Sequence, residues 1–228
     1  MNMNKLALAC GVALLGLSSV VAAEVSTNIG VTSNYIWRGM TQNGNDTALS
    51  GGIDYSHDSG IYAGTWISEA WTDYELDLYG GYGGEVAGIS YDAGLIYYTY
   101  TTDADSNFAE INANVGWDFL SAGFAYVITA EDAVEAVEED MYFYVGASYD
   151  LPEDFSIGLT VGFINTDGDG DADGEDYTHY QFDVTKSTGD FGDVTFSLSD
   201  TDLDRNEVAA AGTDDADMRF LVSWSKEF

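Results

Sequence analysis

Apolar and polar residues alternate along the chain from residue 24 to its end, and few windows show the spacing of an amphipathic helix. Successive side chains of a β-strand point to opposite faces, so this pattern predicts strands with one apolar and one polar face. In one segment, Tyr74, Leu76 and Leu78 alternate with Glu75 and Asp77. The pattern predicts twelve strands, over residues 25–37, 47–57, 61–71, 74–85, 88–101, 108–118, 121–130, 141–151, 155–165, 177–187, 193–200 and 217–228.

Residues 1–23 have the features of a secretory signal peptide. Lys5 carries a positive charge, an apolar run follows over residues 6–21, and small residues precede the expected cleavage site. The apolar run is shorter than the roughly 20 residues of a membrane-spanning helix. A lipoprotein modified at Cys10 is the alternative, but it would leave a stunted signal sequence. We therefore expect residues 24–228 to form one β-domain without cysteine.

The predicted connections alternate in length. Outer-membrane barrels join their strands by short periplasmic turns and longer outer loops, and an even strand count returns the C-terminus to the periplasmic side. Apart from a short link at 72–73, the connections after odd-numbered strands are the long ones (40–46, 102–107, 131–140, 166–176, 201–216), and those after even-numbered strands are short (58–60, 85–88, 119–121, 152–154, 188–192).

These features together predict an all-β protein, a transmembrane antiparallel up-and-down β-barrel of about 12 strands in the bacterial outer membrane. The chain has no residues to spare for a separate plug inside the barrel. A soluble periplasmic β-sandwich is the alternative, because its strands also alternate between apolar and polar residues. A sandwich gives no reason for the alternating loop lengths.

The last strand ends in Phe228, with Trp224 on the same face. A terminal aromatic residue after alternating apolar positions is similar to the signal that the barrel assembly machinery of the outer membrane recognises. We therefore expect Phe228 and Trp224 to act as an assembly signal. Aromatic residues near other strand ends, among them Trp37 and Trp117, are predicted to form girdles at the membrane surfaces.

Several segments resemble the TorF-type porin family of proteobacteria. The similarity covers most of residues 24–228 and is densest over residues 30–100, although Thr101 stands where the family pattern has proline. The resemblance implies an outer-membrane barrel and says little about the solute. The segments are SNYIWRGMTQ (33–42), GIDYSH (52–57), GIYAGTW (60–66), ELDLYGGY (75–82) and GLIYYTY (94–100).

The chain is strongly acidic, with 40 Asp and Glu against 6 Lys and Arg and a formal charge of −34. This balance excludes a nucleic-acid-binding protein, which needs cations opposite the phosphates. Arg38 and Arg219 are predicted to be neighbours on the first and last strands, at the outer end of the lumen. Some strand carboxylates alternate with the apolar residues and are therefore predicted to face the lumen. They are Asp54, Glu75, Asp77, Asp92, Glu110, Asp118 and Asp183.

We expect these arginines and carboxylates to form a constriction whose net negative field favours cations. The predicted function is passive passage of small hydrophilic solutes through the barrel. Alternatively, arginines and carboxylates pair to fill a closed structural barrel, and its acidic outer loops bind divalent cations, lipopolysaccharide or another surface.

One acidic loop matches the first half of an EF-hand calcium loop, with candidate ligands Asp169, Asp171, Asp173 and Glu175. Tyr180 stands where the motif requires a bidentate glutamate, so the sequence predicts at most a loosely bound Ca²⁺ and no other cofactor. Enzymatic activity is not expected. His57 and His179 are predicted at opposite ends of the barrel, whereas a histidine-dependent site needs its partners within hydrogen-bond reach.

Overall fold

The computed structural model describes residues 23–70, 73–102, 104–131, 138–166, 176–203 and 218–228. Almost all of its elements are strands, as the sequence pattern predicts. They are β1 (Glu24–Thr32), β2 (Ile36–Trp37), β3 (Met40–Thr41), β4 (Ala48–Ser56), β5 (Ile61–Ala70), β6 (Asp73–Val86), β7 (Ile89–Tyr100), the 3-10 helix η1 (Ala104–Ser106), β8 (Phe108–Trp117), β9 (Leu120–Ala130), β10 (Met141–Leu151), β11 (Phe155–Asn165), β12 (Tyr177–Ser187), the 3-10 helix η3 (Gly189–Phe191), β13 (Asp193–Thr201) and β14 (Arg219–Glu227).

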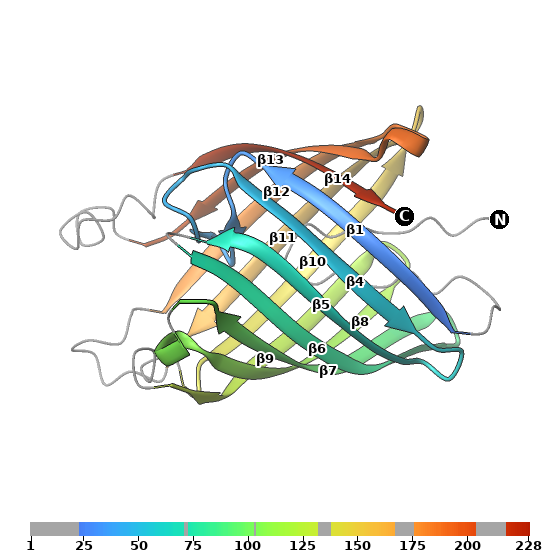
Figure 1. Cartoon of the computed structure of the whole chain (residues 1–228). Coiled ribbons are helices and arrows are strands. Elements are labelled where there is room, and N and C mark those ends of the chain that lie inside the picture. Colours follow the sequence, from blue (N-terminus) through green and yellow to red (C-terminus); the bar gives the residue numbers. More distant parts are fainter. Residues whose placement is uncertain (1–22, 71–72, 103, 132–137, 167–175, 204–217) are drawn as a thin grey trace.

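The described strands, apart from β2 and β3, form one closed barrel of twelve antiparallel strands (Figure 1). Consecutive strands pair from β4 to β14, and β1 pairs with both β4 and β14. Val31 of β1 therefore stands opposite Leu49 on one side and Trp224 on the other. The predicted all-β barrel is confirmed.

The strands β4 to β14 begin and end within two residues of their predicted bounds. The connections join them as expected. Those at 33–47, 101–107, 131–140, 166–176 and 202–218 belong to one end, which we call the outer end, and those at 57–60, 87–88, 118–119, 152–154 and 188–192 belong to the other, the inner end. The prediction is wrong for the first strand, because β1 ends at Thr32 rather than at Trp37.

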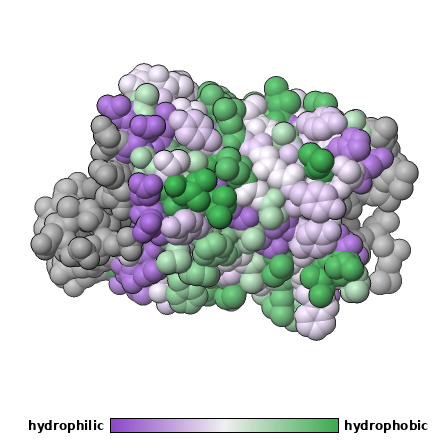
Figure 2. All heavy atoms as spheres, turned by 90° about the horizontal axis from the view of Figure 1, so that it is seen from below, coloured by the Kyte–Doolittle hydropathy of each residue, from purple (hydrophilic) through white to green (hydrophobic). Residues whose placement is uncertain are grey.

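Large apolar side chains are exposed on the outside of the wall. Leu78, Val145 and Leu159 each expose about half of their surface, because their parity points them away from the lumen. Figure 2 shows apolar residues recurring along the wall, with hydrophilic residues more frequent toward its ends. Such an extensive apolar surface suits contact with a bilayer rather than with water.

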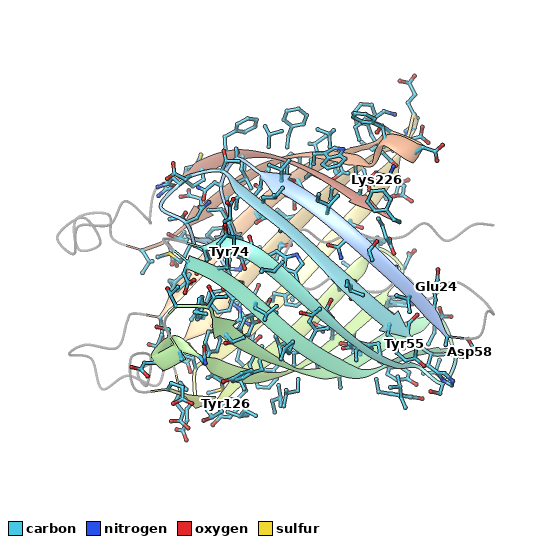
Figure 3. All side chains as sticks on the ribbon, viewed as in Figure 1. Glu24, Tyr55, Asp58, Tyr74, Tyr126 and Lys226 are labelled. Atoms are coloured by element: carbon cyan, nitrogen blue, oxygen red, sulfur yellow. The ribbon has the colours of Figure 1, made fainter. Side chains whose placement is uncertain are left out.

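Aromatic residues lie at both ends of this apolar surface. Figure 3 places Tyr74 and Tyr126 toward the outer end and Tyr55 toward the inner end. Trp117 and Tyr149, near the inner ends of β8 and β10, expose more than half of their surface. This distribution is typical of the interfacial girdles of membrane barrels. No helix among the described residues is long and apolar enough to cross a membrane.

We expect the folded protein in detergent to migrate faster on a gel when unboiled than when boiled. The wall offers no free sheet edge at which unfolding can start, so the barrel resists the detergent until it is heated. The measurement is cold gel electrophoresis of heated and unheated samples. Identical mobility, together with solubility in buffer without detergent, would contradict a membrane barrel.

Candidate functional site

The segment between β1 and β4, residues 33–47, folds into the barrel as a hairpin instead of continuing the wall. We call it the inward hairpin. Its two short strands β2 and β3 pair through Trp37 and Met40. The turn between them consists of Arg38 and Gly39, with φ values of 49° and 87°. Positive φ at both central residues is typical of a type I′ turn, for which glycine is well suited.

The inward hairpin reaches the far side of the lumen. Nη2 of Arg38 lies 2.8 and 2.9 Å from the two carboxylate oxygens of Glu110 on β8. The guanidinium carbon also lies 4.3 Å from the ring centre of Tyr142 on β10, and Tyr177 on β12 donates a hydrogen bond to the Arg38 carbonyl. Because β8, β10 and β12 are not neighbours of β1 or β4 in the closed sheet, these contacts span the interior.

The tip of the hairpin packs tightly against β12 and β13. A Cβ added to Gly39 would lie 2.6 Å from the Cβ of His179 and 2.8 Å from Cγ2 of Thr201. Any larger residue would push the tip away from this wall. Gly39 is therefore required both by the turn and by this close approach.

Further contacts hold the rest of the hairpin. Tyr35 donates a hydrogen bond of 2.6 Å to Glu75 on β6. The ring of Trp37 lies edge-on to Tyr98, with centroids 6.1 Å apart, and joins a buried cluster with Phe108. The prediction that Trp37 belongs to a membrane girdle is therefore wrong.

Arg38 is charged in this setting. Burial by itself lowers the pKa of its guanidinium, but the Glu110 carboxylate and the hydrogen bonds to it raise the pKa above the ordinary value. The prediction that Arg38 lies on the first strand beside Arg219 is wrong. Arg219, at the start of β14, instead donates a hydrogen bond of 2.5 Å to Asn45 of the inward hairpin. The two arginines thus donate to different acceptors, Glu110 and Asn45. Two guanidinium groups placed side by side would repel each other.

The lumen carboxylates lie mainly on one side of the barrel, on β4 and β6 to β8. Asp54, Glu75, Asp77 and Glu110 are buried, and Asp92 and Asp183 are half-buried. Asp118 was expected among them but lies exposed in the inner turn after β8, with a positive φ of 54°. Alternation no longer predicts the direction of a side chain at this position, because the strand has ended and the chain turns to β9.

Most of these carboxylates accept hydrogen bonds from neighbouring side chains. Tyrosine hydroxyls donate to Asp54, Glu75 and Glu110, and amides of Asn and Gln donate to Asp92 and Asp183. The donors are Tyr79 to Asp54, Tyr35 and Tyr100 to Glu75, Tyr98 to Glu110, Asn114 to Asp92 and Gln181 to Asp183.

The opposite side of the lumen is lined by neutral polar groups. Hydroxyls and an amide occupy the inward positions of β11, β12 and β13, at Thr160, Gln181, Thr195, Ser197, Ser199 and Thr201. The interior is thus polarised, with an acidic side facing a hydroxyl-rich side. A solute in the lumen would meet carboxylates and tyrosines on one flank and neutral donors and acceptors on the other.

The predicted assembly residues lie at the inner end of β14. Phe228 exposes 66% of its surface, and its backbone exchanges hydrogen bonds with Thr27 of β1. Trp224 donates its indole hydrogen to the Phe191 carbonyl, 2.8 Å away. Both residues therefore support the junction between the last strand and its neighbours.

The predicted calcium ligands Asp169, Asp171, Asp173 and Glu175 lie outside the described residues. Among the residues that are described, no group of three or more acidic, histidine or cysteine side chains is placed to hold a metal ion.

The two histidines are far apart in the barrel, as expected. His57 lies in an inner turn, where its Nδ1 is 2.9 Å from the Ser59 hydroxyl. His179 is buried behind the tip of the inward hairpin, and its Nε2 shares a hydrogen bond with the hydroxyl of Tyr142. Asp176 accepts a hydrogen bond from the backbone of Thr166, and Asp183 accepts one from Gln181.

Arg38→Gln should destabilise the protein by about 3 kcal/mol, because the substitution leaves Glu110 buried without its counter-charge. The free energy of unfolding can be measured from the loss of the fast-migrating gel band in urea. The double variant Arg38→Gln/Glu110→Gln is the control, and it should recover much of the loss because no unpaired charge remains. Equal stability of the single variant and the wild type would contradict a structural role for this ion pair.

Comparison with solved structures shows that the fold is shared with porins. The KdgM porin superposes with a TM-score of 0.56 over 89% of this chain and 98% of its own, at 8% sequence identity. A second structure is described as the KdgM porin in complex with disordered oligogalacturonate. The NanC porin superposes with a TM-score of 0.55 over 89% of this chain and 98% of its own, at 12% identity. At such low identities the likeness concerns the fold alone.

Comparison with curated protein sequences gave no match. A family model, in contrast, matches residues 18–228, which is nearly the whole chain. Its description is "Bacterial protein of unknown function (Gcw_chp)". The protein therefore belongs to the Gcw_chp family of bacterial proteins, whose function is unknown.

Proposed function

We propose that the protein is a porin of the bacterial outer membrane that lets small hydrophilic solutes diffuse passively and favours cations. A closed barrel with an apolar exterior, aromatic residues at both ends and a polar interior supports the membrane location. The porin fold of its structural neighbours supports the channel function. The proposal includes no enzymatic step, because the described histidines have no suitable acidic partner.

The charge of the lumen carries the cation preference. The described part of the lumen contains Asp54, Glu75, Asp77, Asp92, Glu110 and Asp183, and the arginines beside it are Arg38 and Arg219. The inward hairpin narrows the passage beside the acidic side, so a permeating ion comes close to these groups. Carboxylates inside a narrow, low-dielectric wall attract cations and repel anions.

The negative charge of the lumen indicates a solute different from the one in the KdgM complex. Oligogalacturonate is a polyanion, and the acidic lumen of this chain would repel it. We therefore infer that the solutes of the two barrels differ in charge even though their folds are alike. The solutes proposed here are inorganic cations and neutral or positively charged small molecules.

The proposal also includes four further expectations from the sequence. They are a signal peptide over residues 1–23, contacts with lipopolysaccharide through the acidic outer loops, insertion by the barrel assembly machinery, and membership in the TorF-type porins. The three outer loops richest in acidic residues, 131–140, 166–176 and 202–218, are largely outside the described part of the chain, as are residues 1–22.

The inward hairpin also supports a second candidate function, a closed structural barrel whose outer loops bind cations or another surface. The hairpin spans the lumen from β1 to β8 and β12, and its contacts fill part of the interior. Reconstitution in planar lipid bilayers distinguishes the two functions. An open porin conducts, and a closed barrel that is correctly folded does not.

The reversal potential under a KCl gradient should show that K⁺ is preferred over Cl⁻. The preference should weaken as salt rises, because the Debye length shrinks from about 10 Å at 0.1 M to about 3 Å at 1 M. Glu75→Gln/Asp77→Asn should lower the permeability ratio by about twofold or more, because charges in a buried wall are screened less than charges on a solvated loop. The control neutralises two carboxylates in residues 131–140. Anion preference would contradict the proposal.

Phe228→Ala should strongly reduce the amount of protein in the outer membrane while the protein that does fold remains stable. The substitution keeps the backbone hydrogen bonds to Thr27 and removes only the exposed ring, which we propose is read by the assembly machinery. Quantitative immunoblots of outer-membrane fractions measure the effect. Tyr149→Ala, which removes an equally exposed aromatic ring at the inner end, is the control. Normal membrane levels of Phe228→Ala would remove this role.

A further inference from the structure

Three buried carboxylates lie together beneath the inward hairpin, on the acidic side of the lumen. Glu75 and Asp77 belong to β6, and Glu110 belongs to β8. Each exposes 3% or less of its surface. Arg38 is the cation that the structure pairs with this cluster, so three carboxylates face one guanidinium.

Two of the three carboxylates accept hydrogen bonds from neighbouring side chains. Glu75 accepts hydrogen bonds from Tyr35 and Tyr100 at 2.6 and 2.9 Å. Glu110 accepts them from Arg38 at 2.8 and 2.9 Å and from Tyr98 at 3.1 Å. The tyrosines and the arginine of the cluster therefore donate their hydrogen bonds to Glu75 and Glu110.

Asp77 is the exception. Its Oδ1 is buried and has no hydrogen-bond partner among the described residues. A buried carboxylate oxygen without a donor is unfavourable unless a proton or a cation neutralises the group. Asp77 thus provides an unoccupied acceptor in the middle of a cluster that already binds one cation.

Aromatic rings flank this acceptor. Trp66 on β5 and Tyr98 on β7 stand directly opposite Asp77 in the sheet, one on each side, and all three point into the lumen. Tyr35 of the inward hairpin packs edge-on against Trp66, with ring centroids 5.6 Å apart. A carboxylate between aromatic rings is a suitable environment for an organic ammonium group, which binds both by charge and by cation–π attraction.

Arg38 shows how this interior holds an organic cation. Its guanidinium carbon lies 4.1 Å from the ring centre of Trp37 and 4.3 Å from that of Tyr142, while its nitrogen contacts Glu110. Asp77 likewise has an aromatic residue opposite it on each neighbouring strand, Trp66 and Tyr98.

We propose that Asp77, flanked by Trp66 and Tyr98, binds the ammonium group of a small alkylamine that enters the lumen. Glu75 and Asp77 are the carboxyl groups of the cluster that the described ion pair leaves without a cation, and a diamine offers one ammonium group for each. Because Asp77 exposes only 3% of its surface, neighbouring side chains must move aside when the amine binds. This inference rests on the proposed function, since the amine reaches Asp77 through the lumen, and it adds a solute class to the general cation preference.

The test is isothermal titration of the folded protein in detergent with 1,4-diaminobutane, with 1,4-butanediol as the uncharged analogue. We expect the diamine to bind and the diol not to bind. Asp77→Asn should weaken diamine binding by about tenfold or more, because a charge-assisted contact is lost from a buried site.

Asp92→Asn is the matched control. It removes another lumen carboxylate by the same substitution, on β7, where Asn114 is a partner of the carboxylate. It should weaken binding much less than Asp77→Asn, because it changes only the general field of the lumen. Equal losses in the two variants would overturn the assignment to Asp77, as would an absence of diamine binding to the folded wild type.

Bilayer recordings separate this inference from the proposed function. K⁺ current without any effect of the diamine would overturn the amine site and leave the porin intact. Diamine binding by titration in a protein that carries no current would overturn the porin and retain the site. Current that the diamine reduces in the wild type, and reduces far less in Asp77→Asn, would support both.

Discussion

Closure of the sheet is the constraint on which the rest of this structure depends. β1 is the strand that closes it, because it pairs with β4 along one edge and with β14 along the other. The terminal Phe228 completes the seam through two backbone hydrogen bonds with Thr27. Once the sheet is closed, each side chain of the wall points either into the lumen or to the outside, and successive residues of a strand alternate between the two.

The closed lumen explains the unusual use of tyrosine. A carboxylate that turns inward loses water, and it needs a donor that also fills space. Tyrosine has an apolar ring and a hydroxyl that donates a hydrogen bond, so it meets both needs. Glu75 and Glu110 each accept a hydrogen bond from a lumen tyrosine on β7, Tyr100 and Tyr98. The tyrosines that point into the lumen thus allow carboxylates to be buried there.

The alternation of apolar and polar residues was sufficient to predict the strands of the wall, but not the inward hairpin. Alternation predicts extended backbone correctly at Ile36 and Trp37, which do form a strand, but it does not identify the partner of that strand. The partner is Met40–Thr41 of the same hairpin rather than β4 or β14. The turn-forming pairs Ser33-Asn34 and Arg38-Gly39 were the available signal that the chain leaves the wall there. Arg38 and Glu110 are 72 residues apart, and no local pattern relates them.

The inward hairpin and the wall are held by different forces. Wall strands are joined by continuous backbone hydrogen bonds on both sides. Among the described residues, the hairpin is joined to the rest of the barrel by an ion pair, side-chain hydrogen bonds and ring contacts. Segments with few such contacts open at lower free energy than the sheet around them. The position of the hairpin is therefore easier to change than the wall around it.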